Sequence, residues 1–198
     1  MTDIARFRDF VAATARLIAG TTDETTLLTA LAPKLAELVG YDDWLPEAYA
    51  VAGGEKYRQY LLYADPLERF SIVSFVWGPG QGTPVHDHRV WGLVGVLRGE
   101  ELSVSYERRP DGTLRAGQPE RLRAGQTAAV SPQIGDIHAI SNGLADRSSI
   151  SIHVYGGNIG TIRRSIFDAR TGSAREFISG YSNETVPNLW LRAQPGTA

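Results

Sequence analysis

The strongest constraint on the fold is a series of short, apolar, β-type segments that begins near residue 56. Glycine-bearing turns separate these segments, and no helical pattern lies between them. Many short strands with regular turns predict a β-sandwich or β-barrel, because an α/β sheet needs a helix between successive strands. The predicted strands are 57–63, 70–77, 93–97, 102–107, 128–130, 137–140 and 149–155.

Two amphipathic helices are predicted before the strands. Apolar residues recur at spacings of three and four over residues 3–19, and again from Thr22 or Asp23 to about Val39. Pro33 lies inside the second segment and predicts a kink or a break there. We expect a single domain over residues 1–198, with a helical segment at 1–40 and a β-barrel core at 56–190. Because the helices carry no convergent polar groups, we expect them to form a lid or a buttress.

The composition excludes several classes of function. The formal net charge is −2 over 198 residues, which gives no case for nucleic acid or an acidic membrane surface as a partner. The chain has no cysteine, which excludes disulfides, thiolate ligands and cysteine nucleophiles. No apolar run approaches the length of a membrane span, and the first six residues do not resemble a secretory signal. We therefore expect a cytoplasmic protein with no membrane partner, and the sequence does not indicate its oligomeric state.

A pair of closely spaced histidines is the first candidate for a functional site. The chain has four histidines, and two of them share the triplet His86-Asp87-His88. On a strand, both rings would point to the same face. Two neutral imidazoles that converge are a ready pair of ligands for a first-row transition metal. The alternative interpretation is two ordinary strand histidines.

Glycines and a third histidine give this triplet a recognisable context. Gly80 lies six residues before His86, and Gly99 lies eleven after His88. A second punctuated run holds Gly125, Pro132, Gly135, His138 and Asn142. Together the two runs resemble the two motifs of the cupin superfamily. The resemblance implies a mainly β fold, a cupin jelly-roll β-barrel with an N-terminal helical cap, in which His86, His88 and His138 meet.

The usual cupin carboxylate is missing from this chain. A cupin motif has a glutamate about four residues after its second histidine, where this sequence has Gly92 and Leu93. Glu100 and Glu101 come next, but we expect them at the turn after the strand, which makes them poor candidates. Three neutral imidazoles leave the +2 charge of a metal uncompensated, and this favours an anionic ligand such as a thiolate. Zinc hydrolysis, the rival use of three histidines, needs a general base that the sequence does not indicate.

The segment Ser151–Tyr155 alternates polar and apolar residues. Ser151, His153 and Tyr155 therefore share one face of the predicted strand. A chain of hydrogen bonds through these side chains could orient the phenol and tune its affinity for protons. The alternative is a half-buried strand with a polar outer face. A nucleophilic triad is excluded, because no acidic residue on this face orients the histidine.

These features together resemble the bacterial thiol dioxygenase family, which includes cysteine dioxygenase and 3-mercaptopropionate dioxygenase. The likeness rests on Trp77-Gly78, the His86-Asp87-His88 triplet, His138 and the Ser151–His153–Tyr155 face. It implies an iron(II) enzyme that adds both atoms of O2 to a thiol sulfur, giving a sulfinic acid. By carry-over, His86, His88 and His138 would bind iron. Ser151, His153 and Tyr155 would form the outer-sphere relay, and the partners would be a small thiol and O2.

The chain departs from the mammalian type in two ways that bear on substrate. Without cysteine, Tyr155 must lack the covalent Cys–Tyr crosslink of that type. The mammalian type also uses an arginine on the first strand, where this chain has Arg58-Gln59. A glutamine there and a later arginine resemble the mercaptopropionate branch. We therefore expect Gln59, Arg164 and Tyr155 to bind the substrate, with Arg58 and Arg163 as runners-up. The expected substrate is 3-mercaptopropionate first and L-cysteine second.

Residues near the triplet are expected to shape the pocket. Trp91 and Gly92 would do so by packing, and Gly95 would leave space that a larger residue would fill. Two other functions stay open on the sequence alone. One is a cupin isomerase or hydrolase that uses zinc, nickel or manganese. The other is a non-catalytic cupin that binds or senses a small ligand.

Overall fold

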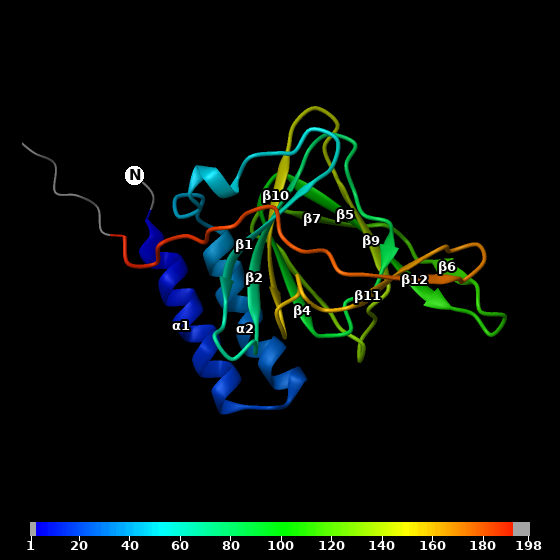
Figure 1. Ribbon diagram of the computed structural model, residues 1–198, viewed down its shortest axis with the longest axis horizontal. Helices are drawn as coiled ribbons and strands as arrows, with labels where there is room; N and C mark the ends of the chain where they lie inside the picture. The colour runs from blue at the N-terminus through cyan, green and yellow to red at the C-terminus, as the bar shows by residue number, and fades with distance from the viewer. Residues whose placement is uncertain (1–2, 192–198) are drawn as a thin grey trace, which may run out of the picture.

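The computed structural model describes residues 3–191, which form two facing β-sheets with a pair of helices packed on the outside of one sheet (Figure 1). The helices come first, as α1 (Ile4–Gly20) and α2 (Glu24–Val39), and a short 3-10 turn, η1 (Glu47–Tyr49), follows them. Twelve strands then make up the rest of the ordered elements. The mainly β fold with an N-terminal helical cap, expected from the sequence, is confirmed.

Both predicted helices form, and an aspartate caps the N-terminus of each. The Asp3 carboxylate accepts a hydrogen bond from the backbone N–H of Ala5, and the Asp23 carboxylate accepts one from Thr26 at 2.7 Å. Such caps satisfy N–H groups that have no partner inside the helix. Of the kink or break predicted at Pro33, the break is wrong, because α2 continues from Glu24 to Val39 with Pro33 inside it. Burial of the apolar face of α2 outweighs the loss of one backbone hydrogen bond.

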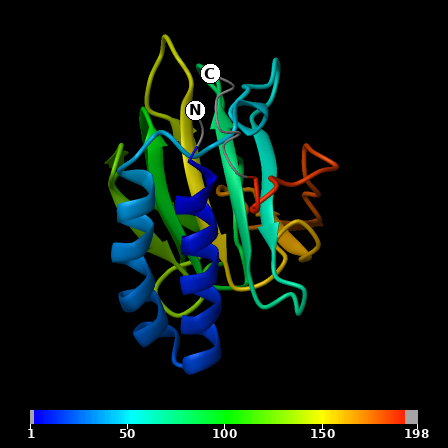
Figure 2. The ribbon, with the colours of Figure 1, turned by 90° about the vertical axis from the view of Figure 1, so that its left-hand side faces the viewer.

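The first sheet has five strands in the order β1-β2-β10-β4-β8. Their bounds are β1 (Arg58–Ala64), β2 (Ser71–Trp77), β4 (Gly92–Arg98), β8 (Thr127–Val130) and β10 (Ser149–Tyr155). Figure 2 shows α1 and α2 side by side across the outer face of this sheet. Leu31 and Leu35 of α2 are fully buried there. The helices are therefore a buttress behind the sheet and not a lid over the barrel.

The second sheet is longer and more irregular, with the order β12-β11-β3-β9-β5-β6 and β7 paired to β5. Its strands are β3 (Val85–His86), β5 (Glu100–Arg108), β6 (Leu114–Ala116), β7 (Glu120–Arg123), β9 (His138–Asn142), β11 (Arg164–Phe167) and β12 (Ala174–Phe177). Four of these, β6, β7, β11 and β12, were not predicted from the sequence. They are three or four residues long, too short for an alternating pattern to stand out from loop sequence.

The central strands β2 and β10 are buried on both faces. On β10, Ile150, Ile152 and Val154 join the core beneath the helices. Ser151, His153 and Tyr155 point the other way, into the barrel, where Tyr155 packs in a second, smaller core. The half-buried strand with a polar outer face is therefore excluded. The polar face of β10 is an internal one, because helices cover the opposite face.

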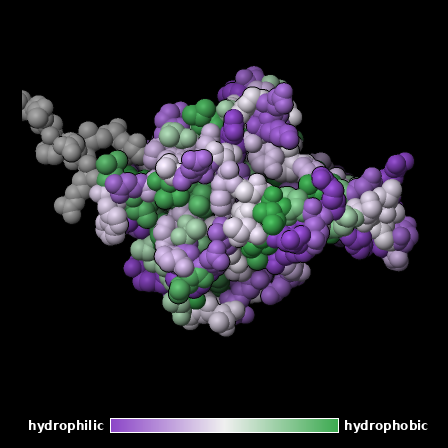
Figure 3. All heavy atoms as spheres, in the orientation of Figure 1, coloured by the Kyte–Doolittle hydropathy of each residue, from purple (hydrophilic) through white to green (hydrophobic). Residues whose placement is uncertain are grey.

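The outer surface has no single dominant apolar face in the view of Figure 3, where hydrophobic and hydrophilic residues alternate over the barrel and the helices. Neither of the two long helices in residues 3–191 combines the length and hydropathy that a membrane span requires.

Candidate metal centre

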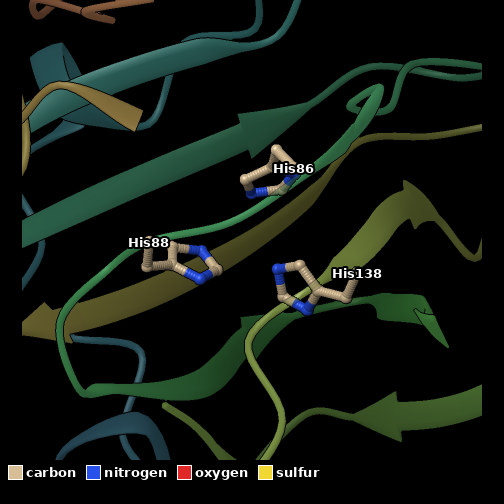
Figure 4. A group of neighbouring side chains, drawn as sticks. All are labelled: His86, His88 and His138. Atoms are coloured by element: carbon tan, nitrogen blue, oxygen red, sulfur yellow. The ribbon is translucent and has the colours of Figure 1, made fainter. Parts of the chain in front are cut away.

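Three histidine rings converge inside the barrel (Figure 4). His86 lies on β3, His88 follows in the next loop, and His138 begins β9 directly opposite His86 in the strand pairing. One nitrogen of each ring lies within 4.8 Å of the others, and all three side chains are buried. Within residues 3–191, this is the only cluster of three or more such groups placed to hold a metal ion, and no aspartate or glutamate belongs to it.

Two of the rings are oriented by hydrogen bonds to their Nδ1 atoms. His86 Nδ1 donates to the backbone carbonyl of Pro84 at 3.0 Å. His88 Nδ1 donates to the carboxylate of Asp136 at 2.9 Å. A ring whose Nδ1 carries the hydrogen presents the lone pair of Nε2 to the cluster, as metal-binding histidines require. These two hydrogen bonds fix the tautomer of His86 and His88 independently of a bound metal.

The reason why His86 and His88 point the same way differs from the one expected. Strand β3 ends at His86, so alternation along a strand does not place His88. The chain turns sharply here, and Arg89 has a positive φ of 62°. The Asp136 carboxylate instead accepts hydrogen bonds from the backbone N–H and the ring of His88. Asp136 lies two residues before His138, so one short segment supplies a ligand and positions another.

Burial keeps the three rings neutral. Desolvation lowers the pKa of His86 to about 3, and the neighbouring His88 acts in the same direction. Burial also lowers the pKa values of His88 and His138, although the Asp136 hydrogen bond opposes the shift at His88. Since metals bind neutral imidazole, a set of rings that resists protonation is ready to coordinate near neutral pH. The donor set therefore fits a divalent transition metal.

No carboxylate occupies the usual cupin position. A Cβ atom added to Gly92 would lie 3.0 Å from the ring of Tyr155, so this position has no room for a glutamate. Glu100 points outward and pairs with Arg121. Glu101 is fully buried, but its Oε1 lies 4.0 Å from Nε2 of His153 and not at the three-histidine cluster. Both glutamates were also expected at a turn, whereas the structure places them on strand β5.

The polar face of β10 forms a continuous chain of hydrogen bonds. Ser151 Oγ lies 2.8 Å from Nε2 of His153, and Nδ1 of His153 lies 2.8 Å from the hydroxyl oxygen of Tyr155. The indole N–H of Trp77 donates to Ser151 Oγ at 3.1 Å. The Tyr155 ring stacks on His88, with centroids 5.3 Å apart. The chain of hydrogen bonds thus ends at the metal cluster, where burial raises the pKa of the Tyr155 phenol.

A cavity of about 200 Å³ opens between the cluster and the β11–β12 edge. It is lined by Tyr57, Gln59, Phe75, Trp77, Thr83, Pro84, His86, His88, His138, Ile140, His153, Tyr155, Arg164, Ile166, Phe177 and Ser179. The metal cluster, two members of the relay and all three expected substrate-binding residues, with Tyr155 in both groups, therefore line one cavity. Its lining contains no acidic side chain among the described residues, and Arg164 is its only arginine.

Arg164 is held firmly in the cavity wall. Its side chain is buried and donates to Ser179 Oγ at 2.7 Å. The Gln59 amide donates to the same Ser179 oxygen at 3.0 Å and to the carbonyl of Gly180 at 2.7 Å. The guanidinium also lies 4.7 Å from the centre of the Phe177 ring. Arg164 Nε is buried and has no hydrogen-bond partner within residues 3–191.

The remaining candidates lie outside this cavity. Arg58 is exposed, and Arg163 is exposed and pairs with Glu176 at 3.3 Å. Trp91 packs over Gly156, away from the cavity wall. The absence of a side chain at Gly95 makes room for Leu35 of α2 and does not enlarge the pocket. A Cβ added at Gly95 would lie 2.9 Å from Leu35. That expectation was wrong because Gly95 faces the helices.

Sequence reasoning missed several residues of the site. Asp136 could have been suspected from its position two residues before His138, but only its contact with His88 reveals its use. Tyr57 reaches the cavity from just before β1, and Phe177 and Ser179 reach it from the end of β12 and the segment that follows. No local pattern marks these residues, since the fold brings them together from distant parts of the chain.

Comparisons with known proteins agree with this geometry. Residues 18–170 match the family model described as cysteine dioxygenase type I. The chain is 28% identical to cysteine dioxygenase type 1 of Danio rerio over 139 residues, which is 66% of this chain and 64% of that protein. It is 24% identical to the Bos taurus protein of the same name over 119 residues, or 59% of this chain and 58% of that one. The matched region thus spans less than two thirds of these relatives.

One solved structure is similar to part of this chain. It is described as a conserved protein with a double-stranded beta-helix domain from Klebsiella pneumoniae subsp. pneumoniae. The match has 20% identity and a TM-score of 0.45, and it covers 61% of this chain and 94% of that one. In this chain, two facing β-sheets enclose the buried histidine cluster, and two helices precede them. Because the family model covers most of the sequence, the chain belongs to the cysteine dioxygenase type I family.

Proposed function

We propose that the protein is an iron(II)-dependent thiol dioxygenase that converts a small thiol carboxylate to a sulfinic acid, with 3-mercaptopropionate preferred and L-cysteine second. One observation carries the proposal. A cluster of three neutral histidines without a carboxylate shares a cavity with a buried guanidinium. Such a cavity is complementary to a molecule that carries a thiolate at one end and a carboxylate at the other.

His86, His88 and His138 would hold the iron. Three nitrogen donors suit several divalent metals, and the family relationship favours iron among them. Bound iron(II) would supply the site at which the thiol loses its proton and at which O2 becomes reactive. The three rings leave the full charge of the ion to be balanced by its exogenous ligands, because no protein carboxylate is present in the cluster.

Arg164 would bind the substrate carboxylate. Its burial makes a charge-assisted hydrogen bond strong, because little water competes for the guanidinium. Gln59 supports it indirectly, because both side chains donate to Ser179 Oγ. Arg58 and Arg163 are not part of this proposal, since both are exposed outside the cavity.

Tyr155 would stand beside the reacting sulfur. Its ring lies against His88, and its hydroxyl group is held by His153. Ser151 and Trp77 in turn fix the position of His153. The chain of hydrogen bonds would therefore keep the phenol oxygen in one place and allow it to exchange a proton with the substrate.

The charge of the cavity favours 3-mercaptopropionate over cysteine. A divalent metal and Arg164 together offer three positive charges, and no acidic residue among those described lines the cavity. The two anionic ends of deprotonated 3-mercaptopropionate match this environment. The ammonium group of cysteine would enter the same positive field without an anionic partner, which disfavours its binding.

Oxygen consumption by the iron-loaded protein tests the proposal. The protein is loaded anaerobically, and uptake is then followed with 3-mercaptopropionate and with L-cysteine. We expect turnover with both thiols, a higher kcat/KM for 3-mercaptopropionate, and a sulfinic acid that takes both oxygen atoms from 18O2. Stoichiometric zinc that supports turnover, with iron inactive, would instead indicate a metal hydrolase or isomerase. An absence of uptake with either thiol would refute the dioxygenase assignment.

A further inference from the structure

Strand β5 carries a buried charged residue that the proposed function does not use. Glu101 is fully buried, and neither of its carboxyl oxygens has a hydrogen-bond partner within residues 3–191. All other β5 residues are at least partly exposed. A carboxyl group buried without hydrogen bonds is strongly unfavourable, and an apolar side chain at the same position would avoid this penalty. A glutamate here therefore indicates a use that depends on its carboxyl group.

The carboxyl group of Glu101 faces the relay. Its Oε1 lies 4.0 Å from Nε2 of His153, which is the only basic group within that distance in the described part of the chain. Glu101 belongs to the second sheet and His153 to the first, so the contact reaches across the barrel. The carboxyl group lies near the same ring nitrogen that Ser151 contacts, whereas Tyr155 contacts the other nitrogen.

The hydrogen bonds of the relay can run in two directions. If Nε2 of His153 carries the hydrogen, the ring donates to Ser151, and Nδ1 accepts from the Tyr155 hydroxyl group. If Nδ1 carries it, Ser151 donates to the ring, the ring donates to Tyr155, and the Tyr155 hydrogen points elsewhere. The heavy-atom distances are the same in both cases. The choice depends on the charges at the two ends of the ring.

An acidic side chain lies near one end of the ring, and a basic side chain lies on the side of the other end. The N–H side of a neutral imidazole is the positive end of its dipole. Glu101 lies near Nε2, whereas Arg164 lines the same cavity as Tyr155. Asp136, the other acidic group near the site, is bound to His88. We infer that Glu101 is a positioning residue that holds the hydrogen of His153 on Nε2, so that the Tyr155 hydroxyl group donates to Nδ1.

This arrangement determines what Tyr155 offers to a ligand. Its hydrogen is engaged with His153, so its oxygen faces the cavity as a hydrogen-bond acceptor. A substrate group that brings its own hydrogen, such as a thiol, fits this oxygen. This consequence rests on the proposed thiol dioxygenase function, whereas the tautomer of His153 does not.

Nuclear magnetic resonance of the ring nitrogens tests the tautomer directly. The chain has four histidines, and a His153→Gln variant identifies the signals of the fourth ring in 15N-histidine-labelled, metal-free, full-length protein. We expect the hydrogen of His153 on Nε2 in the wild-type protein and on Nδ1 in Glu101→Gln. A wild-type ring with its hydrogen on Nδ1 alone would overturn the inference, and this result needs no folded variant. An unchanged tautomer in a folded Glu101→Gln variant would also overturn it.

Kinetics of the iron-loaded protein give a second readout. Glu101→Gln should lower kcat with 3-mercaptopropionate by at least about tenfold, because a wrongly placed imidazole hydrogen disables a relay, and should leave KM within about twofold. Glu100→Gln is the matched control, since it makes the same substitution at the preceding residue, which pairs with Arg121 on the outside. Equal losses in both variants, or a change in KM alone, would count against the inference. If the wild-type protein oxidises no thiol, the proposed function fails while the tautomer experiment still decides the role of Glu101.

Discussion

Replacement of Arg164 by glutamine gives the sharpest test of how the cavity recognises its substrate. Arg164 is 4% exposed, and the only hydrogen bond of its side chain within residues 3–191 goes to Ser179. Glutamine keeps a polar side chain but removes the positive charge. The substrate carboxylate would then lose a charge-assisted hydrogen bond in a site with little water.

The expected magnitude follows from the strength of that bond. A hydrogen bond to a charged group contributes about 1.5–3 kcal/mol, and each 1.4 kcal/mol corresponds to about a tenfold change in an equilibrium constant. The kcat/KM for 3-mercaptopropionate should therefore fall by about 10- to 150-fold, mainly through KM. Folding should not suffer greatly, because the variant no longer buries a guanidinium whose Nε has no partner.

The assay compares two thiols and two variants. Oxygen uptake is measured with 3-mercaptopropionate and with ethanethiol, which has no carboxylate and should react equally well with wild type and Arg164→Gln. Arg163→Gln is the matched control, since Arg163 is the preceding residue and lies outside the cavity against Glu176. If Arg164→Gln slows both thiols equally, or if Arg163→Gln causes the larger loss, the assignment of Arg164 to the carboxylate is refuted.

Three further predictions concern the cluster and the relay. Tyr155→Phe should retain iron, measured by metal analysis, while oxidation slows or loses its coupling to product; loss of iron would mean that the residue is structural. Asp136→Asn should weaken metal binding about 10- to 100-fold in a competition titration with a chelator, because His88 loses the carboxylate that orients it, and an unchanged affinity would contradict this. Acid should destabilise the metal-free protein. The folded-state pKa of His86 is about 3 and its ordinary value is 6.5, so the unfolded chain binds more protons between these values, and stability is lost as the pH falls below 6.5. Urea unfolding should show a loss of about 1.4 kcal/mol per pH unit for each such histidine, and a flat profile from pH 6.5 to 4.5 would contradict it.

Much of the fold could be predicted from the sequence, because local patterns carry the information. Apolar residues at helical spacing located α1 and α2, and runs of β-branched and apolar residues located β2, β4 and β10. The period of two along β10 was sufficient to place Ser151, His153 and Tyr155 on one face. Strands β6, β7, β11 and β12 were not predicted, since pairing with distant strands defines them and local propensity does not.

The residues of the candidate site were likewise predicted only in part. The spacing of the triplet singled out His86 and His88. The resemblance to the cupin motifs added His138 and marked the missing carboxylate at Gly92. The sequence could not distinguish Arg164 from Arg163, or Gln59 from Arg58, because neighbouring residues on a strand face opposite sides and the register was unknown. It also could not show that Asp136 orients His88 or that Glu101 faces His153. Those contacts join residues tens of positions apart, and only the packing of one sheet against the other brings them together. Residue chemistry along the chain determined which groups this protein can use, and tertiary structure decided which of them meet.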